Sequence, residues 1–572
     1  MIWWGELPGR AQAERAAVSV LAEQNPWLKN VVWRLAANLQ LVADFDLMIG
    51  DQSILLTLVY PDFFPDTAPS VVPRDRVRLS GHQYGAAGEL CLEHRPDNWS
   101  PEITGAMMIE SAYRLLSVEQ ETGQPAESDH RTLPAQQVRT TALRFLCSDL
   151  VRAGLGMVEE GSVVEAEIQE HYYSSVWAAQ LARIGPADAT IWAEPKRRGY
   201  GANSVASKAI RFPEGVAIEC ESLDELIALL ESHGHGALGQ ELLKASGASA
   251  VILCEGDNIL VAMVYGDVEK RTLIRYRVVM TEVDSARLEP GYTHLNAKRV
   301  AVVGCGSVGS KVAVHLARSG VGQFVLVDGD VLASGNLVRN ELDWRAVGMH
   351  KSQALECRLL EISADCVVTS RTTVLGGQES GGATAVTIKH ISGCDVIIDA
   401  TADPTVFNLC ASIARRAKKP MCWAQVFGGG VGGIVVRSRP EMDPAPLTAR
   451  QRIEAWYADQ GIAWPSEQTS QPYAEVGESG PPLIADDADV SVVAAHLSRF
   501  AIDLLARPDA TIFPYSAYLI GMAERWVFTA PFDVRPIDLG TSDGWSAEAQ
   551  EEDLDALKQL LADLFPGAGD AG

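Results

Sequence analysis

The chain has 572 residues, which is more than one hydrophobic core usually supports and indicates three or more domains. Its 48 Lys and Arg against 74 Asp and Glu give a formal net charge of −26, which argues against nucleic acid or an anionic membrane as the main ligand. The 10 cysteines form no C-x-x-C pair, so neither a disulfide framework nor a zinc ribbon is indicated.

The N-terminal region predicts an α+β arrangement. An amphipathic helix is expected over residues 11–23, followed by strands over residues 31–35, 41–49 and 54–59. The proline- and aromatic-rich run that begins at Tyr60 cannot continue a central strand. Further on, Trp99-Ser-Pro101 predicts a helix start with Ser100 as N-cap and Pro101 at the first helical position.

A cysteine lies between these segments, in the run Gly81-His-Gln-Tyr-Gly-Ala-Ala-Gly-Glu-Leu-Cys91-Leu. A lone cysteine is more often a buried apolar residue than a nucleophile. The order of helix, strand meander, cysteine segment and Trp-Ser-Pro resembles the ubiquitin-conjugating fold over residues 1–120, and this resemblance implies that Cys91 forms a thioester. The family usually has His-Pro-Asn before its cysteine. Here the residues are His82, Gln83 and Tyr84, so the amide that would steady the oxyanion is missing or supplied elsewhere, and His82 is as readily structural as catalytic.

The next region predicts a linker and then an α/β domain. A polar stretch with two prolines begins at residue 119, and the linker is assigned to residues 121–137. The following domain, residues 138–290, has no phosphate-binding glycine motif. Its expected helices cover residues 135–155 and 222–233, and its expected strands cover residues 215–220, 250–254, 259–265 and 273–280.

A glycine-rich turn follows an apolar strand at residues 300–303. Gly304-x-Gly306-x-x-Gly309 leads into a helix expected to begin near Ser310, and the free N–H groups at the start of such a helix suit a phosphate. This turn alone also fits NAD or FAD, because Asp328 follows the next strand, where a ribose-binding acid is expected.

The residues after Asp328 separate the two interpretations. Asp330, Asn336, Arg339 and Lys351 follow in quick succession. Two cations, an amide and additional carboxylates suit a triphosphate with Mg²⁺ better than a nicotinamide.

The ordered set resembles the ThiF/MoeB and ubiquitin-activating adenylation domain, over residues 297 to about 435 of a C-terminal domain assigned to residues 291–572. The resemblance implies a Rossmann-like fold that binds ATP and Mg²⁺, with Arg339 and Lys351 also catalytic. It places the metal on an acid after the strand that ends at Asp399. Asp403 is favoured, and a one-residue offset leaves Asp399 as the alternative. The nucleotide-binding positions implied are Gly304, Gly306, Gly309, Ser310, Asp328, Asp330, Asn336, Arg339 and Lys351.

The same resemblance bears on the rest of the chain. Activating enzymes often pair an active adenylation half with a degenerate one, so residues 138–290 are either such a half or an unrelated α/β spacer. Residues 437–489 are rich in Pro, Ser and acids and predict a crossover loop. Activating enzymes also normally carry a cysteine after the adenylation core. This chain has none after Cys422, so Cys422 and Ser479 are the candidate second carriers.

A conjugating module joined to an activating module resembles the fused enzymes of bacterial CBASS antiphage operons. These enzymes attach the C-terminal glycine of a CD-NTase, a cyclic-oligonucleotide synthase, to target amines. Two other substrates stay open: a ubiquitin-like protein of an operon with a JAB peptidase, and a sulfur carrier or small molecule. A scaffold with two decayed sites is a further alternative. We expect a cytoplasmic protein that binds neither nucleic acid nor membrane, because no signal segment or apolar run of membrane length is present and the net charge is strongly negative. The resemblance to ThiF-type domains, which usually dimerise, implies a homodimer.

Overall fold

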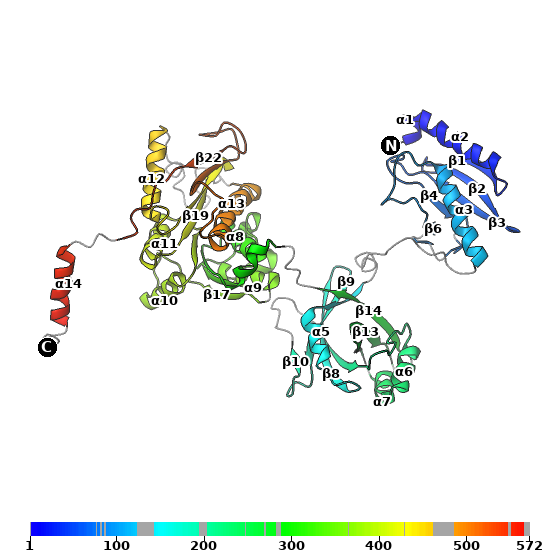
Figure 1. The fold of residues 1–572 in the computed structure, drawn as a ribbon, viewed down its shortest axis with the longest axis horizontal. Helices are drawn as coiled ribbons and strands as arrows, with labels where there is room; N and C mark the ends of the chain where they lie inside the picture. The colour runs from blue at the N-terminus through cyan, green and yellow to red at the C-terminus, as the bar shows by residue number, and fades with distance from the viewer. Residues whose placement is uncertain are drawn as a thin grey trace. The chain divides into compact units, whose positions relative to one another are not determined.

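The computed structural model describes residues 2–75, 77–80, 83–84, 87–122, 142–193, 203–245, 247–267, 270–281, 288–363, 365–427, 430–461, 485–546 and 551–564. The chain divides into two units, Met1–Arg139 and Thr140–Gly572 (Figure 1). The second unit contains two separate eight-stranded sheets, one in a middle domain and one in a C-terminal domain. No helix among the described residues is long and apolar enough to cross a membrane.

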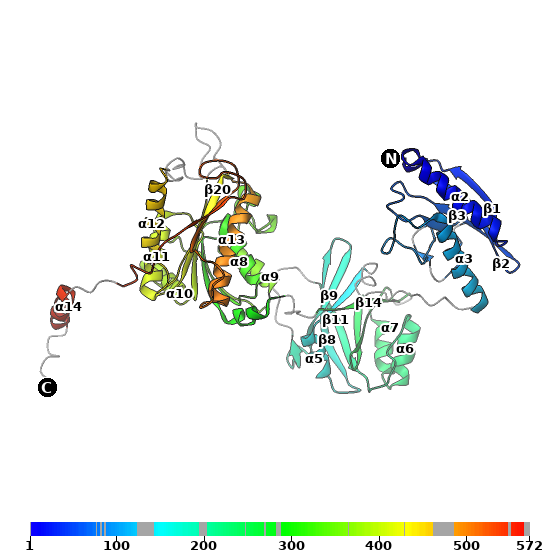
Figure 2. The ribbon, with the colours of Figure 1, turned by 45° about the horizontal axis from the view of Figure 1, so that its top comes forward.

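The N-terminal unit is a four-stranded antiparallel meander packed against helices (Figure 2). Alternate residues of the second strand, Ala43, Phe45 and Leu47, are fully buried in one core with residues of the two long helices. The elements are α1 (Trp3–Glu6), α2 (Pro8–Gln24), β1 (Leu28–Leu35), β2 (Leu41–Ile49), β3 (Gln52–Val59), β4 (Ser70–Pro73), β5 (Gln83–Tyr84), β6 (Glu89–Leu90) and α3 (Gly105–Thr122). The helix and the three strands expected from the sequence are confirmed as α2, β1, β2 and β3; β2 has the predicted bounds, and the other three elements are slightly longer than predicted.

Helix α3 begins at Gly105, so the predicted start with Ser100 as N-cap and Pro101 at the first helical position is wrong. The buried carboxylate of Glu14 explains the later start, because its Oε2 accepts hydrogen bonds from the Gly105 N–H at 2.6 Å and from the Tyr60 hydroxyl at 2.8 Å. A Cβ at position 105 would lie 2.0 Å from the Tyr60 hydroxyl, so only glycine fits there. The helix continues to Thr122 and includes the first residues of the predicted linker, whose residues 123–137 lie outside the described part of the chain.

The strands of the middle domain close into a ring, because β8 pairs with both β11 and β9. Parallel and antiparallel pairs both occur, in the order β10-β9-β7-β14-β13-β12-β11-β8. The elements are β7 (Leu143–Cys147), α5 (Asp149–Gly156), β8 (Val163–Tyr173), β9 (Val176–Ile184), β10 (Trp192–Ala193), β11 (Asn203–Arg211), α6 (Leu223–Ser232), α7 (Gly236–Lys244), β12 (Ser249–Glu255), β13 (Asn258–Tyr265) and β14 (Thr272–Met280). A closed ring differs from the open parallel sheet of an adenylation half, so it favours the interpretation as an unrelated α/β domain.

Two predictions for the middle domain are wrong. The helix expected over residues 135–155 contains strand β7, in which Phe145 and Cys147 are buried between two parallel neighbours, and helix α5 starts only after the N-cap Ser148. The strand expected over residues 215–220 is not a strand. Ile218 and Cys220 alternate with more exposed residues because they pack against the core cluster beneath α6 and α7, and not because of sheet pairing.

The C-terminal domain is a three-layered α/β structure in which a mostly parallel sheet has helices on both faces (Figures 1 and 2). Its strand order is β17-β16-β15-β18-β19-β20-β21-β22, with the first five strands parallel. The strands are β15 (Arg299–Val303), β16 (Gln323–Val327), β17 (Val367–Arg371), β18 (Val396–Asp399), β19 (Met421–Val426), β20 (Gly432–Ser438), β21 (Ala517–Gly521) and β22 (Val534–Ile537). The central strands are mostly apolar and buried because both faces of the sheet are covered.

Helices α8, α9 and α13 pack on one face of this sheet and α10, α11 and α12 on the other. The helices are α8 (Ser307–Arg318), α9 (Lys351–Ile362), α10 (Gly381–Ser392), α11 (Pro404–Ala417), α12 (Pro446–Asp459), α13 (Asp487–Ala506) and α14 (Glu551–Leu564), with short 3-10 turns at η2 (Pro290–Ala297), η3 (Ser334–Val338) and η4 (Trp344–Ala346). The predicted crossover at residues 437–489 is therefore partly helical. Arg437 belongs to the core, where it pairs with buried Asp503 at 2.8 Å, because β20 extends further than the sequence indicated.

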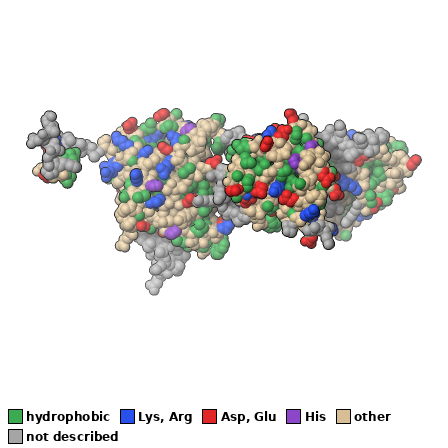
Figure 3. Space-filling view, turned by 90° about the horizontal axis from the view of Figure 1, so that it is seen from below, with side chains coloured by type: hydrophobic (Ala, Val, Ile, Leu, Met, Phe, Trp, Pro, Cys, Tyr) green, Lys and Arg blue, Asp and Glu red, His purple; other side chains and the backbone are tan. Residues whose placement is uncertain are grey.

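Charged side chains of both signs are visible on one face of the molecule (Figure 3). On the face that Figure 3 shows, acidic side chains are conspicuous on the middle domain, and Lys and Arg side chains gather on the C-terminal domain.

Candidate active site

A cavity of about 550 Å³ lies at the carboxyl ends of the parallel strands, between β15 and β18, where the strand order reverses. In open α/β sheets a ligand binds at this switch point. Predicted residues from four separate segments line it: Gly304, Gly306, Asp328, Asp330, Asn336, Arg339 and Lys351. The volume lies within the range typical of small-molecule sites.

The three glycines have different surroundings. Gly306 faces open space, and no atom would lie within 4 Å of a Cβ added there, so a ligand can approach its backbone closely. A Cβ at Gly309 would lie 1.8 Å from the carbonyl oxygen of Gly304, so this glycine lets α8 pack against the end of β15. Gly304 itself has φ +86°, a conformation that favours glycine. Helix α8 begins at Ser307, three residues earlier than predicted.

Asp328 follows β16 and is held by two backbone groups. Its Oδ2 accepts from the N–H of Cys305 at 2.7 Å, and its Oδ1 accepts from the N–H of Asp330 at 2.8 Å. Burial raises the pKa of this carboxyl, and the two backbone hydrogen bonds and the charge of Lys351 oppose that rise. Each carboxylate oxygen has a second lone pair, so Asp328 retains the capacity to accept from a ligand hydroxyl.

Two cations face the same cavity. The ammonium of Lys351 lies 2.8 Å from Oδ2 of Asp330, and the backbone N–H of Lys351 donates to the carbonyl of Asp330 at 2.9 Å. Asp330 therefore holds the lysine at the first residue of α9. Arg339 lines the cavity beside Asn336, whose Oδ1 accepts from the N–H of Ala333 at 2.9 Å.

Three predicted nucleotide- or metal-site residues do not line this cavity: Gly309, which packs α8 against the end of β15, Ser310 and Asp403. Ser310 is fully buried and its hydroxyl accepts from the N–H of Glu341 at 3.2 Å, so it anchors the following segment to α8. Asp403 is the N-cap of α11, with its Oδ1 accepting from the N–H groups of Thr405 and Val406 at 2.7 and 3.0 Å. It lines a neighbouring smaller cavity together with Asp399.

Asp399 and Asp403 are the candidates for a metal. Asp399 is 3% exposed, and its Oδ1 accepts from the N–H and hydroxyl of Thr401 at 3.0 and 2.6 Å. Carboxylate oxygens are the ligands that Mg²⁺ prefers, so the chemistry of this pair fits the ion. Among the described residues no three His, Cys, Asp or Glu side chains gather in a metal-binding group, so the remaining ligands would come from a nucleotide and water.

The sequence interpretation missed several residues of the cavity. Asn340 is buried and joins two segments, since its Nδ2 donates to the carbonyl of Cys305 at 3.2 Å and its Oδ1 accepts from the N–H of Leu342 at 3.0 Å. Asn340 directly follows Arg339 in the sequence, so the motif that contains Arg339 could have indicated that it lies at this cavity. Thr373 and Leu375 follow β17, and their place at the carboxyl end of a neighbouring parallel strand could have been inferred once that strand was recognised.

Cys91 lies in the N-terminal unit, directly after β6. Leu90 and Leu92 on either side are buried, whereas Cys91 is partly exposed. Of the ten cysteines, eight are buried and only Cys91 and Cys357 are partly exposed. Partial exposure of Cys91 is typical of a nucleophilic cysteine, whereas a structural cysteine of the core is buried.

The side chain of Gln83 forms hydrogen bonds with backbone groups that precede Cys91 in the chain. Its Oε1 accepts from the N–H groups of Leu79 and Ser80 at 2.5 and 3.0 Å, and its Nε2 donates to the carbonyl of Gly88 at 2.8 Å. An amide is thus present upstream of the cysteine, but it is engaged with the loop backbone. His82 lies outside the described residues.

The structure describes only one of the two candidate second carriers, Cys422. Cys422 is the second residue of β19 and is completely buried, and burial raises the pKa of its thiol to about 12. A thiol of this kind is neither accessible nor ionised, so its role as a fallback carrier is not supported. Ser479 lies outside the described residues.

Comparison with known proteins agrees with the position of the cavity. Residues 282–445 match the ThiF family. The matched range contains the glycine turn, both cations and both candidate metal ligands.

The chain is similar to three proteins over different extents. It is 28% identical over 567 residues to the uncharacterized protein y4oA of Sinorhizobium fredii, which covers 89% of this chain and 91% of the relative. It is 32% identical over 125 residues to the ATP-dependent ubiquitin transferase-like protein Cap2 of Enterobacter hormaechei, covering 22% of this chain and 20% of the relative. A crystal structure of E. coli MccB with ATP aligns over 44% of this chain and 67% of that chain, with 16% identity and a TM-score of 0.34.

Proposed function

We propose that this chain uses ATP to adenylate the C-terminal glycine of a protein and then transfers the acyl group through Cys91 to a target amine. The observation that carries the proposal is the cavity at the switch point of a ThiF-family segment, where glycine backbone, two acids and two cations meet. The partly exposed Cys91 in a separate α+β unit supports the second half.

The first step is attack of the tail carboxylate on the α-phosphorus of ATP. The bond between that phosphorus and the bridging oxygen breaks, and pyrophosphate leaves with the electron pair. Lys351, Arg339 and the N–H groups at the start of α8 donate to the phosphate oxygens, where negative charge accumulates. Asp328 accepts from the ribose, and Asp403 or Asp399 would hold Mg²⁺, which would supply charge neutralisation at the phosphates.

The second step moves the acyl group to sulfur. The thiolate of Cys91 attacks the carbonyl carbon of the acyl adenylate, the C–O bond to AMP breaks, and a thioester forms. An amine of the target then attacks the thioester, an amide forms, and the thiol is released. Because the remaining cysteines are buried, apart from Cys357, we infer direct transfer from the adenylate to Cys91 of the same chain or of a second copy in a homodimer.

We propose a CD-NTase of a CBASS antiphage operon as the activated protein. The similarity over 125 residues to Cap2, whose name describes an ATP-dependent ubiquitin transferase-like protein, supports this choice. The match covers about a fifth of each protein, so a ubiquitin-like protein from an operon with a JAB peptidase is the second candidate. Activation of a sulfur carrier or a small acid is the third, because a ThiF-family domain alone does not require conjugation.

Pyrophosphate exchange separates these candidates. The full chain is incubated with ATP, Mg²⁺ and labelled pyrophosphate, together with a CD-NTase, a ubiquitin-like protein or a small carboxylic acid. We expect exchange that depends on a protein with an intact C-terminal glycine and is lost when that glycine is removed. Exchange stimulated equally by small acids would refute the choice of a protein tail, and exchange with no acceptor dependence would refute the mechanism.

A further inference from the structure

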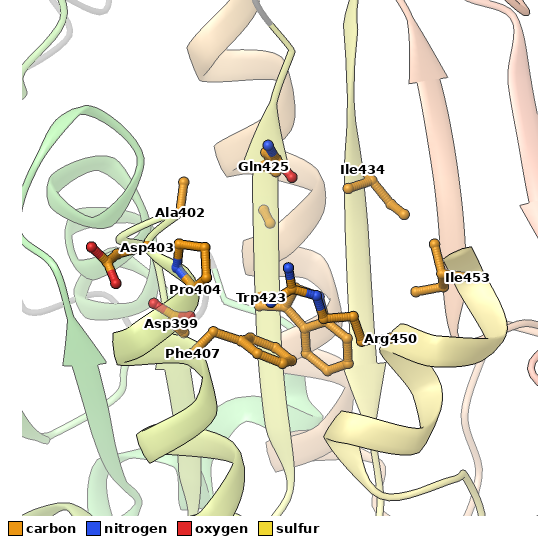
Figure 4. A pocket seen from close by; sticks show the side chains of 11 residues that line it. Asp399, Ala402, Asp403, Pro404, Phe407, Trp423, Gln425, Ile434, Arg450 and Ile453 are labelled. Carbon is orange, nitrogen blue, oxygen red and sulfur yellow. The ribbon is translucent and has the colours of Figure 1, made fainter. Parts of the chain in front are cut away.

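We call the cavity of about 550 Å³ at the ends of the parallel strands the nucleotide cavity. A second, smaller cavity adjoins it. It measures about 80 Å³, and Ala402 and Ala424 line both cavities. We call it the tail pocket and define it by the six side chains that give it its chemistry. Asp399, Asp403 and Phe407 lie on one side of it, Arg450 lies on the other, and Trp423 and Gln425 of β19 lie between them (Figure 4).

The charge of the tail pocket is negative. Asp399 and Asp403 contribute two carboxylates against the one guanidinium of Arg450. The guanidinium of Arg450 also forms an ion pair with Glu454, which does not line the pocket: Nε of Arg450 lies 3.1 Å from Oε1 of Glu454. Asp399 is almost completely buried, and a buried carboxylate gains most from a cation that can replace the lost water.

The walls of the pocket are aromatic. The rings of Phe407 and Trp423 are in edge contact, with centroids 5.2 Å apart at 67°. The guanidinium of Arg450 lies 5.1 Å from the centroid of Phe407, so this site already holds one cation against an aromatic face. Aromatic faces attract cations, and an alkyl chain packs well on them.

The size of the pocket fits one amino-acid side chain. At roughly 10–15 Å³ for each water-sized position, a cavity of about 80 Å³ takes about five to eight non-hydrogen atoms. A lysine side chain has five such atoms and an arginine has seven. A nucleoside is too large for the tail pocket, so the base and ribose of ATP are assigned to the larger cavity, which Asp328 lines.

We propose that the tail pocket binds a lysine or arginine side chain that lies shortly before the C-terminal glycine of the activated protein. The inference rests on the proposed function, because the carboxylate of the C-terminal glycine must reach the nucleotide cavity while the side chain before it lies in the adjoining tail pocket. It adds a specificity that the activation chemistry does not require. The substrate class is a protein whose tail ends in a basic residue, up to two spacer residues and glycine.

Binding is measured on the full chain with a non-hydrolysable ATP analogue. The probes are acetylated tetrapeptides that end in glycine and carry Lys, Gln or Glu one, two or three residues before it. Saturation-transfer NMR at millimolar peptide gives the affinities. We expect the Lys peptide to bind on the order of tenfold more tightly than the Glu peptide at one of the three positions, with Gln between them. Equal affinities, a preference for Glu at all positions, or no binding of any peptide would overturn the proposal.

Variants connect the preference to the pocket. Arg450→Gln removes the competing cation and should increase the Lys-to-Glu affinity ratio several-fold. Asp403→Asn keeps a residue that caps α11 and should decrease the ratio. Arg415→Gln removes the same charge from an exposed position on α11 and should leave the ratio unchanged. A ratio that does not respond to Arg450→Gln would place the preference elsewhere and contradict the proposal.

The outcomes separate this inference from the proposed function. Charge-selective peptide binding without pyrophosphate exchange by any protein would support the proposed role of the tail pocket and refute the proposed adenylation. Exchange with a protein tail, together with equal binding of the three peptides, would support the proposed adenylation and refute the proposed role of the tail pocket. If Asp403 acts only as a metal ligand, Asp403→Asn should lower exchange with all tails equally, without changing the affinity ratio.

Discussion

Substituting the glycines of the turn separates packing from ligand contact. A Cβ at position 309 would lie 1.8 Å from the carbonyl oxygen of Gly304, whereas ordinary contacts begin at 3.4 Å. The obstructing atoms are backbone at the end of β15, so α8 must move. We expect Gly309→Ala to cost about 3 kcal/mol by overpacking, offset by about 1 kcal/mol from the better helix propensity of alanine. The net loss of about 2 kcal/mol should lower the unfolding temperature of the C-terminal domain by about 4–8 °C.

Gly306→Ala is the matched control, because no atom lies within 4 Å of the Cβ that it adds. Its unfolding temperature should stay within about one degree of the unchanged protein, while ATP binding weakens because the methyl group occupies the space that a phosphate needs. Scanning calorimetry of the full chain, with hydrogen exchange of residues 299–318 to identify the domain, measures both effects. An unchanged unfolding temperature in Gly309→Ala, or a large decrease in Gly306→Ala, would refute this division between the glycines.

Two further variants test the charged residues. Lys351→Ala removes a cation directed at the phosphates and should decrease pyrophosphate exchange by a factor of about 10² to 10³, whereas Lys389→Ala, on the exposed side of α10, should leave it unchanged; a near-normal rate for Lys351→Ala would show that the phosphates bind elsewhere. Asp403→Ala loses the cap of α11 and should destabilise the domain by about 1 kcal/mol, whereas Asp403→Asn should keep the cap and with it the stability of the domain; equal destabilisation by both would contradict the role of Oδ1 in capping.

The nucleotide cavity was the most predictable part of the fold. Its glycines, acids and cations follow strands or open helices, and the ends of parallel strands meet at one edge of a sheet. The residues that the motif does not contain, such as Thr373 and Leu375, were missed because their strand begins 40 residues after β16 ends. Ser310 was assigned to the ligand although it is buried, because its direction depends on which residue starts α8.

The errors arose where tertiary contacts override a local pattern. Trp99-Ser-Pro101 has the residues of a helix start, but the buried carboxylate of Glu14 selects Gly105 instead. The spacing of apolar residues around Phe145 fits a helix as well as a strand, and the pairing with β14 and β9 decides for the strand. Such pairings join residues far apart in the chain, so no window of sequence contains them.

The most direct test of the central claim is the intact mass of the full chain after incubation with ATP, Mg²⁺ and the protein that supports exchange. We predict one acyl adduct that is released by thiols, absent from Cys91→Ala, and retained in Cys357→Ala, which alters the other partly exposed cysteine. Cys91→Ala should still catalyse pyrophosphate exchange, because adenylation needs only the C-terminal domain. An adduct that persists in Cys91→Ala, or exchange that disappears with it, would contradict the account.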